Sequence, residues 1–359
     1  MKRIKLARVL VGTVILGVAL TMASCSKPDN PPTPTSTDAT MTTPDATGTD
    51  TATDFPTAPT PTQVVESNLD HVTATGGFGE VPDITVPAPW AIDATTTKIL
   101  VQGEGRTVDA KGYVTINYLG INGTTGDKFD DSYSRGAPAT FGLTGVVPGF
   151  GKGLTGQKVG SRVLIAIPGA DGYDAGGGKT DSGINIGDTL VFVVDILGTS
   201  FPGPTGETET PADTTLPVVA GELDKPTVSI NTTATPPADL VIQPLIKGPG
   251  DPVKDTDTLV INYAEYRWDT GALLRQTYGY QPLQGTLSGT IKGWQQGIVG
   301  QPAGSRLLLV VPPSLSYPQG YPKIGLPTAQ TMVYVIDILY AYDASTPAAT
   351  DTPTDTPTG

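Results

Sequence analysis

The chain has 359 residues and a formal net charge of −13, with 35 Asp and Glu against 22 Lys and Arg. An acidic chain repels nucleic acid and anionic lipid head groups, so we exclude both as partners bound by charge. Its single cysteine, Cys25, excludes an intramolecular disulfide. Its single histidine, His71, would have to stand at the centre of any ordinary zinc or His-dependent catalytic site. Nothing around it indicates such a site, so we expect a surface histidine, no metal and no cofactor.

Residues 1–24 predict a targeting segment. Four basic residues precede Val9–Ala19, an apolar run too short to favour a membrane span. The segment ends in Met22-Ala23-Ser24-Cys25, which resembles a bacterial lipobox. The resemblance implies cleavage before Cys25 and a lipid on its sulfur, which would anchor the protein outside the cytoplasm, on the outer face of the bacterial cell membrane. An ordinary secretory signal with an incidental cysteine is the alternative.

Composition divides the rest of the chain. Residues 25–62 are almost entirely Thr, Pro, Asp, Ala and Ser, which predicts a disordered tether. The same composition predicts a linker over residues 201–225 and a disordered tail over residues 343–359. Between these segments lie two candidate domains, residues 63–200 and 226–342. We expect the protein to be a monomer.

The two candidate domains are copies of one unit. Each begins with an apolar strand that ends in tyrosine, Val114–Tyr118 and Leu259–Tyr263. Tyr118 and Tyr263 are 145 positions apart, and a later pair, Tyr173 and Tyr317, are 144 apart. Near-constant spacing over the whole unit indicates a duplicated domain, since solenoid repeats are much shorter.

Each copy predicts an α+β fold, in which a twisted antiparallel β-sheet of about five strands wraps on one short helix. The helix candidates are Gly149–Leu154 and Gly293–Ile298. Arg162 and Arg306 follow Val-Gly-Ser and Ala-Gly-Ser, and we interpret them as residues at the start of a strand that face solvent.

The order of motifs carries a family resemblance. A strand ending in Tyr118 is followed by Phe129-Asp130-Asp131-Ser132, the Val146–Leu154 segment, Val-Gly-Ser-Arg, a loop with Tyr173 and a final Thr189–Phe192 strand. Most of this order returns in the second copy. It resembles the FKBP-type peptidyl-prolyl cis-trans isomerases, over residues 80–199 and 226–342.

The resemblance implies an apolar bowl lined by aromatic residues in the first domain. The residues expected to be catalytic are Tyr118, Phe129, Asp130, Phe150, Tyr173 and Phe192. Those expected to bind substrate are Arg135, Phe141, Val146, Val147 and Ile184. Phe150 would form the floor under the proline ring, and the Tyr173 hydroxyl and the Val147 N–H would hold the peptide's carbonyls. For Phe141 and Phe192, a purely core role is the alternative.

In the second domain the corresponding pocket is degenerate. The residues that match it, or replace its members, are Tyr263, Leu274, Ile291, Trp294, Tyr317, Leu326 and Tyr334. Leu274-Arg275 stands where the first domain has Phe129-Asp130. We expect this domain to bind peptide poorly or to be structural only.

The chemistry of isomerisation suits such a lining. Rotation about an X–Pro bond faces a barrier of about 18–20 kcal/mol, and an apolar pocket that strips water from the amide favours the twisted state. We therefore expect an isomerase that assists the folding of exported proteins, with their proline-containing segments and macrolide inhibitors as partners. The alternatives are a non-catalytic proline-peptide-binding chaperone or scaffold module of the cell envelope, and a structural spacer.

Overall fold

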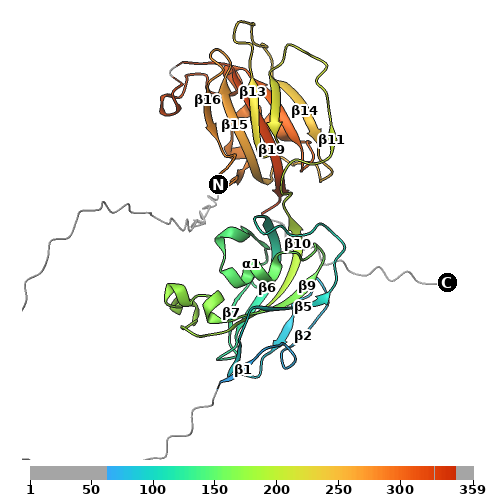
Figure 1. Ribbon diagram of the computed structural model, residues 1–359, viewed down its shortest axis with the longest axis vertical. Helices are drawn as coiled ribbons and strands as arrows, with labels where there is room; N and C mark the ends of the chain where they lie inside the picture. Colours follow the sequence, from blue (N-terminus) through green and yellow to red (C-terminus); the bar gives the residue numbers. More distant parts are fainter. Residues whose placement is uncertain (1–62, 327, 345–359) are drawn as a thin grey trace, which may run out of the picture. The chain divides into compact units, whose positions relative to one another are not determined.

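A computed structural model describes residues 63–326 and 328–344 (Figure 1). The predicted signal peptide, Cys25, the tether and nearly all of the predicted tail lie outside these residues. Within the described ranges, no helix is long and apolar enough to cross a membrane.

The first domain is built on a six-stranded antiparallel sheet with one α-helix (Figure 1). The strand order is β5 (Thr96–Val101), β9 (Arg162–Ile167), β10 (Leu190–Thr199), β6 (Tyr113–Asn122) and β7 (Lys128–Asp131), and β8 (Ala139–Gly142) also pairs with β6. The helix is α1 (Pro148–Leu154). Short 3-10 turns are Leu143–Gly145, Gly169–Asp171, Asp174–Gly176 and Thr180–Ser182. The predicted α+β architecture and helix are present, with one strand more than expected.

Glycine brings α1 close to the sheet. A Cβ on Gly149 would lie 2.2 Å from Ile167 Cγ2, and one on Gly153 would lie 2.6 Å from Ile165 Cγ2. Both helix positions therefore favour glycine, despite its low helix propensity. Pro148 begins the helix, where its missing N–H costs nothing. The close approach directs Phe150, on the next position of the helix, into the core of the domain.

The opposite face of the sheet is covered by the segment that precedes β5. This segment contains two small strand pairs, β1 (Val64–Glu66) with β4 (Trp90–Ile92) and β2 (Thr73–Thr75) with β3 (Asp83–Thr85). Its Leu69, Val72 and Trp90 are buried against Leu164 and Val193 of the central strands. Burial on both faces explains why β9 and β10 are continuous apolar runs, because such strands need not alternate with polar residues.

An ion pair is buried beneath this covering layer. Arg162 and Asp195 face each other across β9 and β10, and neither side chain is exposed. The Arg162 guanidinium donates to both carboxylate oxygens, at 2.6 and 2.7 Å. It also donates to the carbonyls of Gly76 and Glu80 in the covering layer, and the Gly79 N–H donates to Asp195. Our expectation that Arg162 faces solvent was wrong, because a second layer covers the start of its strand.

The second domain repeats this plan with a seven-stranded sheet. The strand order is β11 (Glu207–Thr208), β14 (Val241–Lys247), β18 (Arg306–Val311), β19 (Met332–Tyr342), β15 (Thr258–Arg267) and β16 (Leu273–Gln276), and β17 (Leu283–Thr286) pairs with β15. Its helix is α2 (Lys292–Ile298), and its 3-10 turns are Leu287–Gly289, Pro313–Leu315 and Pro322–Ile324. The hairpin of β12 (Val218–Glu222) and β13 (Lys225–Ser229) takes the covering role. Arg306, which we also expected to face solvent, pairs with Asp337 and donates to the Leu223 carbonyl; both side chains are buried.

The predicted linker 201–225 belongs to the second domain. Phe201 lies in that domain's main core, Leu216 lies in the core under the hairpin, and β11 pairs with β14. We predicted a linker because this segment is rich in Thr and Pro. Its few apolar residues that make core contacts are widely spaced and form no pattern that predicts burial.

We predict that Asp195→Ala lowers the free energy of unfolding by about 3–5 kcal/mol, since it leaves the Arg162 cation buried without its partner. Urea unfolding measures the loss. Asp269→Ala is the matched control: it removes the surface pair Arg267–Asp269, whose Asp is 37% exposed, and should cost about 1 kcal/mol or less. Equal losses in the two variants would contradict this account of the buried pair.

Candidate active site

A cavity of about 260 Å³ opens on the helix side of the first domain's sheet. Nine of the eleven residues predicted for the site line it. Its lining consists of Tyr118, Phe129, Asp130, Phe141, Gly145, Val146, Val147, Phe150, Tyr173, Lys179 and Phe192. We call this cavity the bowl.

Four phenylalanines form its apolar surface. Phe150 of α1 is 5% exposed and meets the ring of Phe192 edge-on, with centroids 5.0 Å apart. Phe129 meets Phe192 at 5.4 Å and 90°, and Phe141 lies 5.7 Å from Phe150. Edge-to-face contacts of this kind hold aromatic rings in fixed orientations. The floor of the bowl is therefore a rigid aromatic surface.

Gly120 on β6 makes room for two of these rings. A Cβ at this position would lie 2.6 Å from Phe129 Cζ and 2.9 Å from Phe192 Cε1. Any larger residue would have to displace both rings. The arrangement of Phe129 and Phe192 thus depends on a glycine that no sequence motif marks.

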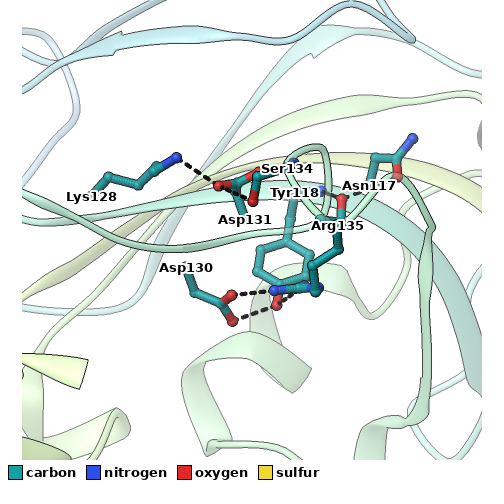
Figure 2. A network of polar contacts seen from close by, with 8 residues as sticks. Asn117, Tyr118, Lys128, Asp130, Asp131, Ser134 and Arg135 are labelled. Atoms are coloured by element: carbon teal, nitrogen blue, oxygen red, sulfur yellow. Dashed lines mark hydrogen bonds and ion pairs between the residues drawn. The ribbon is translucent and has the colours of Figure 1, made fainter. Parts of the chain in front are cut away.

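Tyr118 and Asp130, two polar residues of the bowl's lining, form a hydrogen-bonded network with Arg135, which lies outside the lining (Figure 2). The Tyr118 hydroxyl donates to Asp130 at 2.5 Å, and Arg135 donates to the Tyr118 oxygen at 2.8 Å and also to Asp130. Burial raises the pKa of Tyr118 to about 12, and its hydrogen bond to Asp130 contributes. Burial opposes ionisation of Asp130, but hydrogen bonds from Tyr118 and Arg135 outweigh it and hold the pKa of that carboxyl below its ordinary value. Asp130 is therefore a fixed carboxylate.

The neighbouring carboxylate has a different task. Asp131 is 5% exposed and accepts hydrogen bonds from the Ser134 N–H and hydroxyl and from Lys128 (Figure 2). These contacts fix the turn that follows β7 and so place Arg135. The turn is therefore held by Asp131 and not by its neighbour Asp130.

Two donors in the bowl remain free. Within residues 63–326 and 328–344, neither the Tyr173 hydroxyl nor the Val147 N–H has a hydrogen-bond partner. Both residues line the bowl, beside the aromatic floor. They can therefore donate to carbonyl oxygens of a bound peptide.

Two predicted residues lie outside the lining. Arg135 reaches the bowl only through Asp130 and Tyr118, and Ile184 is 1% exposed in the core behind it. Gly145 and Lys179 line the bowl but were not predicted. The Gly-rich loop around Lys179 gave no periodic signal that could have indicated which of its side chains turns inward.

The second domain keeps the aromatic floor. Trp294 meets Tyr263 and Tyr334 edge-on, with centroids 5.2 and 5.4 Å apart. Leu326 is fully buried in the same core, and Leu274, Ile291 and Tyr317 pack against it. The structure thus brings together all seven residues predicted for this pocket.

Above this floor, however, the second domain places an ion pair. Glu265 occupies the position of Gly120 and is completely buried. Its carboxylate accepts from Arg275 at 2.6 Å and from the Tyr334 hydroxyl at 2.9 Å, and Arg275 donates to the Tyr317 hydroxyl at 2.7 Å. The Tyr317 oxygen, unlike that of Tyr173, is therefore already engaged within the domain.

We predict that Tyr118→Phe shifts the titration of Asp130 to higher pH. The depressed pKa means that this network stabilises the fold above about pH 3.9, the ordinary Asp value, and is lost as pH falls through the folded-state pKa. Removing one donor raises that pKa, so the loss begins at higher pH. Carboxyl NMR shifts of Asp130 measure it, with Tyr113→Phe as the control. An unchanged titration in Tyr118→Phe would show that Arg135 alone sets the pKa.

Comparison with known proteins finds matches in both domains. The sequence model for FKBP-type peptidyl-prolyl cis-trans isomerases matches residues 104–197 and 250–339. A probable FK506-binding protein of Corynebacterium glutamicum is 34% identical over 119 residues, 33% of this chain and 98% of that protein. An FK506-binding protein of Streptomyces anulatus is 35% identical over 123 residues, 33% of this chain and 96% of that protein. FkpA, an isomerase of Escherichia coli K12, is 34% identical over 116 residues, 32% of this chain and 41% of that protein.

Proposed function

This chain belongs to the FKBP-type peptidyl-prolyl cis-trans isomerases, and we propose that its first domain carries the catalytic site. The observation that supports this assignment is the pair of free donors, Tyr173 hydroxyl and Val147 N–H, beside a rigid aromatic floor. The second domain has the floor, but the oxygen of its corresponding Tyr317 hydroxyl already accepts from Arg275, the partner of the buried Glu265.

The geometry suggests how rotation about the X–Pro bond is accelerated. The proline ring rests on Phe150, and the two free donors hold peptide carbonyls. Phe129 and Phe192 surround the amide and exclude water, so the planar amide loses the solvation that stabilises it. The twisted amide is less polar and loses less, which favours the transition state over the ground state. No covalent step is needed.

Asp130 contributes as a fixed negative charge at the edge of the bowl. Its carboxylate is held by Tyr118 and Arg135, so it does not reorganise as the amide twists. Such preorganised charges stabilise changes in charge distribution at no reorganisation cost. The contacts among Asp130, Tyr118 and Arg135 also stabilise the side of the bowl that contains Phe129.

We predict that activity depends on the first domain alone. In the full chain, Tyr173→Phe should lower kcat/KM for a short X-Pro peptide about tenfold, the worth of one charge-neutral hydrogen bond of about 1.4 kcal/mol. The twin variant Tyr317→Phe is the matched control and should leave kcat/KM within about twofold. Equal losses would show that both domains turn over substrate. A folded wild-type chain without turnover would instead favour the proline-peptide-binding chaperone or scaffold module.

We further propose that the enzyme works on exported proteins while anchored through Cys25. This proposal rests on the lipobox-like Met22–Cys25 and on the preceding basic and apolar segment. Slow X–Pro isomerisation limits folding in many chains, and unfolded exported segments supply the proline peptides that this family binds. Macrolides that bind the family are candidate inhibitors, and we expect a monomer.

The anchor has its own test. In a bacterial host, Cys25→Ser should abolish incorporation of labelled fatty acid and move the protein from the membrane fraction to the soluble fraction. Activity on a soluble peptide should be unchanged, because the variant lies outside both domains. Membrane association that persists in Cys25→Ser would overturn the lipid anchor.

A further inference from the structure

Lys179 stands at the mouth of the bowl in a fixed place. Its main chain forms two hydrogen bonds with Ile184, 2.8 Å from its own N–H and 3.1 Å to its own carbonyl. Ile184 is 1% exposed and belongs to the domain core. The exposed Lys179 side chain therefore projects from a backbone that is tied to the core. Its ammonium lies 5.5 Å from the centroid of the Tyr173 ring.

The second domain has the same construction with a different residue. Tyr321 forms the equivalent bridge with Leu326, and its ring stacks on Tyr317 at 5.5 Å and 23°. In both copies, therefore, the side chain at this position lies against the tyrosine of the loop, Tyr173 in the first and Tyr317 in the second. The position is a regular part of the rim, and only its chemistry differs between the copies: a cation in the first and an aromatic ring in the second.

The charge of Lys179 is not balanced locally. The bowl is lined by two ionisable charges of opposite sign, Asp130 and Lys179. Asp130 is already paired with Arg135, whereas no carboxylate in the described residues lies within ion-pair distance of Lys179. The lining of the bowl therefore contains an unpaired cation, although the chain as a whole carries −13.

We propose that Lys179 is a specificity-determining residue that favours substrates with Asp or Glu directly beside the proline. This inference rests on the proposed site in the first domain. A peptide whose carbonyl accepts from the Tyr173 hydroxyl places its neighbouring side chains at the rim, near the ammonium. Exposed ion pairs of this kind are worth about a 1.4- to 5-fold change in an equilibrium, so the preference is modest and measurable.

The test compares peptides that differ only in charge. Glu, Gln or Lys is placed before the proline in one series and after it in another, and kcat/KM is measured with the full chain. In at least one series the wild type should prefer Glu over Lys by about threefold or more. Lys179→Ala should bring this ratio to about one, and Lys179→Glu should invert it. Salt at about 0.5 M should weaken the wild-type preference by screening.

Lys98→Glu provides the matched control. Lys98 is exposed on β5 of the same domain, does not line the bowl, and undergoes the same change in charge. It should keep the wild-type ratio, whereas a lost preference in this variant would assign the effect to overall charge. A wild-type ratio of one in both series, or an unchanged ratio in Lys179→Ala, would overturn the proposal.

The two proposals fail separately. If no peptide is turned over, the catalytic assignment of the first domain fails, and the same peptides then report on Lys179 through their dissociation constants. A Glu-over-Lys ratio in affinity that disappears in Lys179→Ala would still support the specificity role. Equal affinities for the Glu and Lys peptides would refute it.

Discussion

Each domain depends on one buried arginine–aspartate pair that joins its two central strands. Charges removed from water are costly unless every polar atom finds a partner. In the first domain the missing partners come from Gly76, Gly79 and Glu80, and in the second from Leu223. The segment in front of the residues that match the family model is thereby an integral part of each domain. It supplies hydrogen bonds that the sheet cannot provide for itself, and its apolar residues cover the sheet's second face.

The sequence was sufficient for the elements that carry local signals. The duplication follows from spacing and the Pro/Gly-rich helix from local sequence, while the aromatic lining of the bowl follows from the family resemblance that the motif order carries. Arg162, Arg306 and the segment 201–225 could not be interpreted correctly, because nothing local shows that a second layer will cover a strand. The role of Glu265 could not be predicted for a similar reason: it depends on Arg275 and Tyr334 on the neighbouring strands, which are not its neighbours in the sequence. Lys179 lies on a loop, where periodicity gives no information about direction.

The two domains show the same pocket built from two different sets of residues. Gly120, Phe129 and Asp130 correspond to Glu265, Leu274 and Arg275. These exchanges are linked by space and charge. A side chain at the glycine position requires the loss of the phenylalanine ring, and a buried carboxylate requires a cation within reach. The second copy thus has a polar network, whose members are hydrogen-bonded to one another, where the first copy has an apolar bowl, and both copies have an aromatic floor.

Because of the glycines in α1 and α2, residues behind the site determine the position of the aromatic floor. Without side chains at Gly149 and Gly153, the helix rests directly on Ile167 and Ile165. In the second domain the equivalent helix rests on Val311 and Leu309. The height of each aromatic floor is therefore set by the bulk of strand residues that no ligand can touch. Exchanging an isoleucine for a valine at such a position would change what the helix rests on, so that the shape of the pocket can evolve without any change in its lining.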